Sequence, residues 1–225
     1  MPATAASGGN PEIRSARRRR TTLLILAFLA WLLFYWLAEA AHAGERQDID
    51  ELLRATVHRH SAPALTWLMR CITQLGSVWV LIPSAVAAVV LLFLRKWNRA
   101  ATLLLIDMLA VPWLNEYLKI SFHRHRPEAF FGITPADYSF PSAHSLASFC
   151  FYGMLAALLS TRIQRREKRT ALWVAGVSAI LLVGLSRVYL GVHYPSDVIG
   201  GWSAALVWVS VLLVFDQSDS VPKST

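Results

Sequence analysis

Charged residues are scarce in this sequence: Asp, Glu, Lys and Arg make up 16% of its 225 residues, against about 25% in soluble globular domains. Hydrophobic residues make up 55%. This composition excludes intrinsic disorder and a coiled coil, and it disfavours an ordinary soluble enzyme. The two cysteines, Cys71 and Cys150, are too few for a disulfide scaffold, and the apolar run around Cys150 predicts a buried thiol.

The basic residues outnumber the acidic ones, giving a net charge of +8. In a soluble protein this excess would suggest a nucleic-acid partner, but no motif interleaves the charges with exposed aromatic residues for base stacking. We therefore expect no nucleic acid partner. The apolar residues occur in runs of 17 or more, which is the length of a bilayer span.

Six apolar segments predict six transmembrane helices, and the fold class is therefore an all-α membrane bundle. The segments are 21–39, 77–94, 100–118, 143–160, 171–188 and 198–215. Two amphipathic pieces between the first two spans, Ile49–Val57 and Ala64–Ile72, predict short interfacial helices on the outer surface.

The spans divide the chain into a disordered basic N-terminus (1–20), one membrane domain (21–215) and a short cytoplasmic tail (216–225). A cleaved signal peptide is an alternative for the first span, because Arg17–Arg20 precede it and the small residues Ala41-His42-Ala43 follow it. The length of the span and its bulky aromatic residues favour a retained anchor.

The distribution of Lys and Arg predicts the orientation, because cytoplasmic loops retain positive charge. With the N-terminus inside, the inner segments hold 14 of the 22 basic residues and the outer segments hold 8. The sequence therefore predicts a multi-pass protein of the inner (plasma) membrane.

Polar residues near the ends of the spans are costly in a bilayer and therefore informative. They gather in three strings, at 119–127, 139–144 and 186–197. Between His144 and Ser186 lie 41 residues, enough for two crossings that return to the starting side. The short loop before Pro141 stays on that side. We therefore expect all three strings to face one outer pocket.

The residue types in these strings suggest a site for a tetrahedral oxyanion such as phosphate. Three cations, small hydroxyl side chains and a helix N-terminus after Pro141-Ser142 are suitable donors. Two histidines add acid–base or nucleophilic chemistry. His193 and Asp197 are four residues apart, so on a helix the carboxylate would hold one ring nitrogen and leave the other free to attack.

Each of these residues also has a structural interpretation. A lone cation at this depth can extend to lipid head groups, and Ser142 can serve only as a helix cap. A single histidine can be a satisfied structural group, and Asp197 can simply favour the helix dipole. These interpretations do not explain why all the groups lie on one side of the membrane.

Together the strings read K-x6-R-P, P-S-A-H and S-R-x5-H-x3-D. This closely resembles the three-part signature of the type-2 phosphatidic acid phosphatase family, whose membrane members have six transmembrane helices and share a catalytic core with vanadium haloperoxidases. The resemblance covers 119–197 directly. It implies a lipid phosphatase that works without a cofactor or metal, with its active site facing the periplasm or outside.

The resemblance also implies individual roles. His193 would be the nucleophile that forms a phosphohistidine, Asp197 would orient it, and His144 would be the acid and then the base. The phosphate-binding residues would be Lys119, Arg126, Ser142, Ala143 and Arg187, together with the backbone amide of His144. Ser186 matches a motif position with a less defined role. Ala143 stands where the family commonly has glycine; because alanine is small and tolerates the helical φ of a first turn, we expect function to survive.

Other polar groups nearby give weaker signals. Glu116 would pair with Lys119 on one helical face, and Asp107 would face the inside of the bundle. His123 and His125 would be solvated loop residues, although contact with a diphosphate or head group is an alternative. A metal site formed by these two histidines with His144, His193 and Asp197 lacks the usual ligand spacing on a helix.

The sequence thus predicts a phosphatase acting on a lipid monophosphate or diphosphate, with a lipid phosphate and the bilayer as its partners. The candidate substrates are undecaprenyl diphosphate, phosphatidylglycerol phosphate, phosphatidate and lipid A phosphates, with undecaprenyl diphosphate as first choice. The alternatives are a haloperoxidase, a phosphotransferase that passes the phosphoryl group to another lipid, and a non-enzymatic anion or lipid transporter. The oligomeric state is open.

Overall fold

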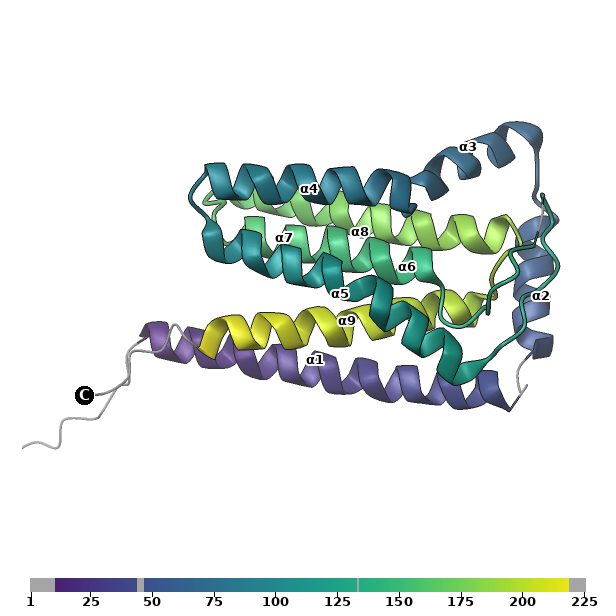
Figure 1. The fold of residues 1–225 in the computed structure, drawn as a ribbon, viewed down its shortest axis with the longest axis horizontal. Helices are drawn as coiled ribbons and strands as arrows, with labels where there is room; N and C mark the ends of the chain where they lie inside the picture. Colours follow the sequence, from purple (N-terminus) through teal and green to yellow (C-terminus); the bar gives the residue numbers. More distant parts are fainter. Residues whose placement is uncertain (1–10, 44–46, 133, 219–225) are drawn as a thin grey trace, which may run out of the picture.

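The computed structural model describes residues 11–43, 47–132 and 134–218, and every regular element in these ranges is a helix (Figure 1). The expected all-α fold class is therefore confirmed. The elements are α1 (Pro11–His42), α2 (Gln47–His58), α3 (Pro63–Gln74), α4 (Val78–Leu94), α5 (Asn98–Phe122), α6 (Ala143–Ser148), η1 (Phe149–Gly153), α7 (Met154–Ser160), α8 (Arg166–Tyr189) and α9 (Pro195–Ser218). The elements α6, η1 and α7 form one continuous helix with a π-helical turn in its middle.

The predicted spans coincide with helices of the structure. Five helices are long and apolar enough to cross a bilayer: α1, α5, the continuous α6–α7 helix, α8 and α9. Helix α4 has 17 residues, about 26 Å at 1.5 Å per residue, and qualifies only together with α3, from which it is bent by 42°. The two short amphipathic segments predicted between the first two spans are also helical, as α2 and α3.

The structure differs from the prediction at the N-terminus. Helix α1 begins at Pro11, so residues 11–20, which the sequence placed in a disordered segment, are helical. Arginine is a good helix former, and Arg17–Arg20 directly precede an apolar helical span that they can extend. The remaining parts of the two predicted terminal segments, 1–10 and 219–225, lie outside the described residues.

The two ends of the bundle differ in character (Figure 1). Helices α1 and α9 lie side by side and run antiparallel, so the start of α1 and the end of α9 share one end. At the other end, α2 lies across the bundle beside the segment that joins α5 to α6. Helix α5 stops at Phe122 because His123 takes a left-handed φ of 49°, and Pro127 then disfavours a return to helix.

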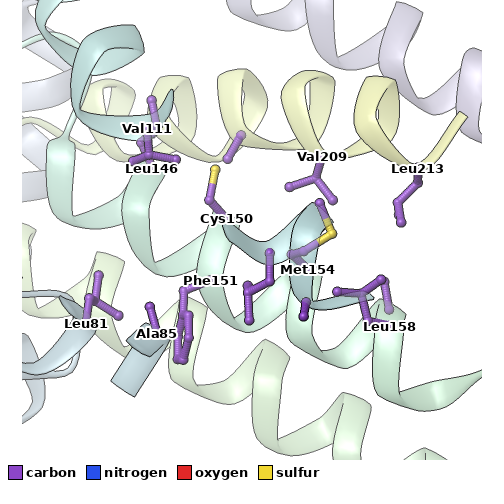
Figure 2. Packing of buried hydrophobic residues seen from close by; sticks show 14 of the residues in the cluster. Leu81, Ala85, Val111, Leu146, Cys150, Phe151, Met154, Leu158, Val209 and Leu213 are labelled. Carbon is purple, nitrogen blue, oxygen red and sulfur yellow. The ribbon is translucent and has the colours of Figure 1, made fainter. Parts of the chain in front are cut away.

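The continuous α6–α7 helix lies at the centre of the apolar core. Leu146, Cys150 and Met154 have no exposed surface, which confirms the predicted buried thiol of Cys150. They belong to one apolar cluster with Leu81 of α4 and Val209 of α9 (Figure 2). The labelled side chains of this cluster are Leu81, Ala85, Val111, Leu146, Cys150, Phe151, Met154, Leu158, Val209 and Leu213.

The outer surface of the bundle is apolar as well. On α1, Phe28 is 58% exposed and Trp31 is 50% exposed, and similar side chains continue along α4, α5 and α8. Exposed apolar surface of this extent is unfavourable in water and suited to lipid. The chain is therefore a multi-pass integral membrane protein.

Candidate active site

The three predicted strings meet at the end of the bundle that carries α2. Arg126 of the first string lies beside His193 of the third, with 2.9 Å between Nη1 and Nε2. The second string joins the third because the backbone N–H of Ser142 donates to the carbonyl of Asp197 at 3.0 Å. The expectation that two membrane crossings return the strings to one side agrees with this arrangement.

His193 and Asp197 form a buried pair. Their exposed fractions are 1% and 0%, and Nδ1 of His193 lies 3.3 Å from Oδ2 of Asp197. This oxygen also accepts hydrogen bonds from the backbone N–H of Tyr194, at 2.8 Å, and from the hydroxyl of Ser139. A carboxylate held in this way assigns the ring proton to Nδ1 and leaves the lone pair on Nε2.

Burial also keeps the His193 ring neutral. Removal from water, together with the charges of Arg126 and Arg187, lowers the pKa of His193 to about 4, although Asp197 acts in the opposite direction. Near neutral pH the ring is therefore unprotonated at Nε2, as a nucleophile requires.

Two of the three predicted phosphate-binding cations share one partner, Asp137. Its carboxylate accepts from Nη2 of Arg126, at 2.9 and 3.0 Å, and from the ammonium of Lys119. Lys119 is only 2% exposed and also donates to the carbonyl of Tyr138 at 2.8 Å. Partial burial would raise the pKa of Asp137, but the bonds from Lys119 and Arg126 lower it to about 2, so the carboxylate is ionised.

The third predicted cation, Arg187, lies at the end of α8. Its Nη1 donates to Oγ1 of Thr73 on α3, at 2.9 Å, and its buried Nε has no partner in the described part of the chain. A half-buried guanidinium with a donor to spare is suited to a ligand oxygen. Ser186 beside it donates to the carbonyl of Val183 at 2.6 Å, within its own helix.

The second string starts a helix, as predicted. Ser142 is the N-cap residue and Ala143 and His144 are the first two residues of α6, whose first-turn amides have no partner within the helix. Ser142 is fully buried. Helix α9 passes close to this turn, because a Cβ at Gly201 would lie 2.8 Å from the carbonyl oxygen of Ser142.

One contact differs from the weaker predictions. Lys119 binds Asp137, whereas Glu116, its expected partner, is exposed. His123 and His125 are exposed loop residues, as expected. Within 11–43, 47–132 and 134–218, no three His, Cys, Asp or Glu side chains are grouped so that they could hold a metal ion.

Sequence reasoning gave no role to three polar residues at this site, Asp50, Arg124 and Asp137. It included Ser139 in the second string but did not predict its bond to Asp197. Asp137 lies in the short loop before Pro141, and Arg124 lies between His123 and His125 of the first string. The sequence does contain a signal for Asp50. Arg54 follows it by one helical turn, so the amphipathic helix predicted at the membrane surface carries a charged pair on one face.

Known proteins resemble this chain in sequence. The family model described as PAP2 superfamily matches residues 100–219. The phosphatidylglycerophosphatase B of Bacillus subtilis (strain 168) is 34% identical, over 83% of this chain and 93% of that protein. An undecaprenyl-diphosphatase of Sulfolobus acidocaldarius is 32% identical, over 87% of this chain and 90% of that protein.

A solved structure shares the architecture. The crystal structure of a transmembrane PAP2-type phosphatidylglycerolphosphate phosphatase from Bacillus subtilis superposes with a TM-score of 0.77 at 29% identity, covering 88% of this chain and 98% of that one. The signature strings, the helical bundle and these relatives lead to one assignment. The chain belongs to the PAP2 superfamily of membrane lipid phosphatases.

Proposed function

We propose that this protein hydrolyses the terminal phosphate of a lipid monophosphate or diphosphate through a phosphohistidine on His193. The observation that carries the proposal is the environment of this ring: Nδ1 faces the buried carboxylate of Asp197, and Nε2 lies 2.9 Å from the guanidinium of Arg126. A nucleophilic nitrogen thus lies directly beside a phosphate-binding cation.

In the first step, Lys119, Arg126 and Arg187 hold the non-bridging oxygens and stabilise the charge that develops on them. Nε2 of His193 attacks phosphorus while the bond to the leaving oxygen breaks, and His144 gives that oxygen its proton. The imidazolium that forms is stabilised by Asp197, which remains ionised.

In the second step, His144 takes a proton from water as the water oxygen attacks phosphorus. The bond between phosphorus and Nε2 breaks, and inorganic phosphate leaves. Ser142 and the amides of Ala143 and His144 assist the phosphoryl oxygens at the helix N-terminus. No step requires a metal, so activity is expected to persist in the presence of a chelator.

The position of the site supports a lipid substrate taken from the outer leaflet. Helix α2 turns Asp50 and Arg54 inward, while its apolar residues Ile49 and Leu52 are 54% and 63% exposed. A helix whose charged residues face the protein and whose apolar residues face outward is suited to lie on a bilayer surface beside the site. Undecaprenyl diphosphate and phosphatidylglycerol phosphate are the preferred candidates, in keeping with the names of the two relatives.

The test is phosphate release from a panel of lipid phosphates in detergent, with and without chelator, by the wild type and His193→Ala. We expect release from at least one lipid, no dependence on chelator, and loss of activity in the variant. Rapid quenching in base should trap an acid-labile phosphoenzyme only in the wild type. Full activity of His193→Ala would overturn the mechanism, and transfer of phosphate to an added lipid alcohol would identify a phosphotransferase.

A further inference from the structure

Arg124 is a buried cation that neither the phosphate-binding set nor the nucleophile pair accounts for. It lies between Lys119 and Arg126 in the first string, and its side chain is 3% exposed. Its guanidinium binds the Asp197 carboxylate through the oxygen that does not face His193. There Nη1 donates to Oδ1 of Asp197 at 2.7 Å, on the oxygen opposite the one that faces His193.

The same guanidinium binds a second carboxylate, that of Asp50 on α2. Nη2 of Arg124 donates to Oδ2 of Asp50 at 2.8 Å. Asp50 is 5% exposed and also accepts from the backbone N–H and the hydroxyl of Ser196, at 3.1 and 2.5 Å. The ring of Tyr194 lies 4.2 Å from Arg124 and packs against its flat face. Both terminal nitrogens of this guanidinium are therefore held by hydrogen bonds, and one of its faces packs against an aromatic ring.

We propose that Arg124 is a positioning residue for Asp197, and that Asp50 anchors it to α2. The proposal rests on the proposed roles of His193 and Asp197. Because Arg124 holds Oδ1, the other oxygen of Asp197 stays aimed at Nδ1 of His193, and Nε2 stays aimed at phosphorus. The docking of α2, which lies outside the three signature strings, thereby controls the orientation of the His193 ring.

Arg54, one turn after Asp50, provides a matched comparison. It is also a buried arginine that joins α2 to the site, but it donates to the carbonyls of Glu128 and Gly191, at 2.6 and 3.1 Å, and to Glu51. The structure gives it no bond to Asp197. A purely structural role of α2 predicts similar effects for Arg54→Met and Arg124→Met, whereas positioning of Asp197 predicts different ones.

The kinetic test compares Arg124→Met, Arg124→Lys, Asp50→Asn and the double variant Arg124→Met/Asp50→Asn. We expect kcat of Arg124→Met to fall about 100-fold with little change in KM, because the nucleophile is misaligned while the phosphate-binding cations remain. Arg124→Lys should recover part of this loss. The double variant should lose much less kcat than the product of the two single losses, because the bond of Asp50 to Arg124 is its link to the Asp197 carboxylate.

A second readout does not depend on turnover. In protein with isotope-labelled histidine, NMR follows the titration of His193, whose signal is assigned by its loss in His193→Gln. Arg124→Met should move this titration to higher pH, because Asp197 then lacks its counter-charge and favours the protonated ring. Arg54→Met should leave it in place.

An unchanged titration in a folded Arg124→Met protein would overturn the proposal, as would equal shifts in both variants. Additive losses of kcat for Arg124→Met and Asp50→Asn would also contradict it. If the wild type releases no phosphate from any lipid, the proposed function fails, while the NMR titration still decides whether Arg124 positions Asp197.

Discussion

Replacing Asp137 with asparagine tests whether a carboxylate of the protein competes with phosphate for Lys119 and Arg126. In the structure these two cations bind the Asp137 carboxylate, and its low pKa of about 2 keeps it ionised at any assay pH. If Lys119 and Arg126 bind phosphate as proposed, the phosphate must displace this carboxylate. Asp137→Asn should therefore strengthen the binding of phosphate and of its analogue vanadate.

The magnitude follows from the exposure of the pairs. The Asp137 side chain is 53% exposed, so solvent screens its attraction to the two buried cations. Ion pairs of this kind contribute about 0.2–1 kcal/mol each. The loss of two pairs should make phosphate binding more favourable by about 1 kcal/mol, which corresponds to about a fivefold decrease in the inhibition constant.

The assay is inhibition of lipid phosphate hydrolysis by inorganic phosphate and by vanadate. Glu128→Gln is a suitable control, because Glu128 is an exposed acid in the same loop and its removal changes the net charge equally. We expect the inhibition constants of the control to stay within about 1.5-fold of the wild type, since exposed charges are screened by salt. Weaker or unchanged inhibition of Asp137→Asn would refute the competition.

The remaining predictions concern the nucleophile and the turn before α6. Burial lowers the pKa of His193 to about 4, so kcat/KM should stay constant down to about pH 5 and fall at lower pH. The values are first corrected for substrate ionisation, which phosphorus NMR measures. A fall of kcat/KM centred near pH 6.5 would contradict this. Gly201→Ala should lower both the thermal stability and kcat, because the new Cβ would lie 2.8 Å from the Ser142 carbonyl oxygen; a wild-type melting temperature would exclude the clash. Ala143→Gly should keep kcat within about twofold, since the amide is retained and α6 tolerates either residue there; a large gain in kcat would show that Ala143 impairs phosphate binding.

The spans and the grouping of the three strings were predictable from the sequence. An apolar segment of about 20 residues has few alternatives to crossing the bilayer, and an even number of crossings returns the chain to the same side. The nearness of Arg126, Ser142, His193 and Asp197 followed from this counting, without knowledge of side-chain positions. The helical state of residues 11–20 was not predicted, because a charged segment beside a span gives no periodic signal.

The tertiary structure decided which polar residues surround the predicted ones. Asp50 and Arg124 are separated by 74 positions in the chain, and they meet only because α2 docks with its charged face inward. Asp137 reaches Lys119 and Arg126 only through the path of the loop between α5 and α6. Such contacts depend on the docking angle of a short helix and on loop geometry, which hydrophobic periodicity does not specify.

The sequence alone thus determined the apolar segments that become the long helices, the family signature and the residues suited to phosphate, because bilayer thickness restricts where an apolar chain can place its charges. The tertiary structure alone decided which partner each charge has: Asp137 on Lys119 and Arg126, and Arg124 between Asp50 and Asp197. Partner choice follows from distances of a few ångströms between segments far apart in the chain, and only the packed fold sets these distances.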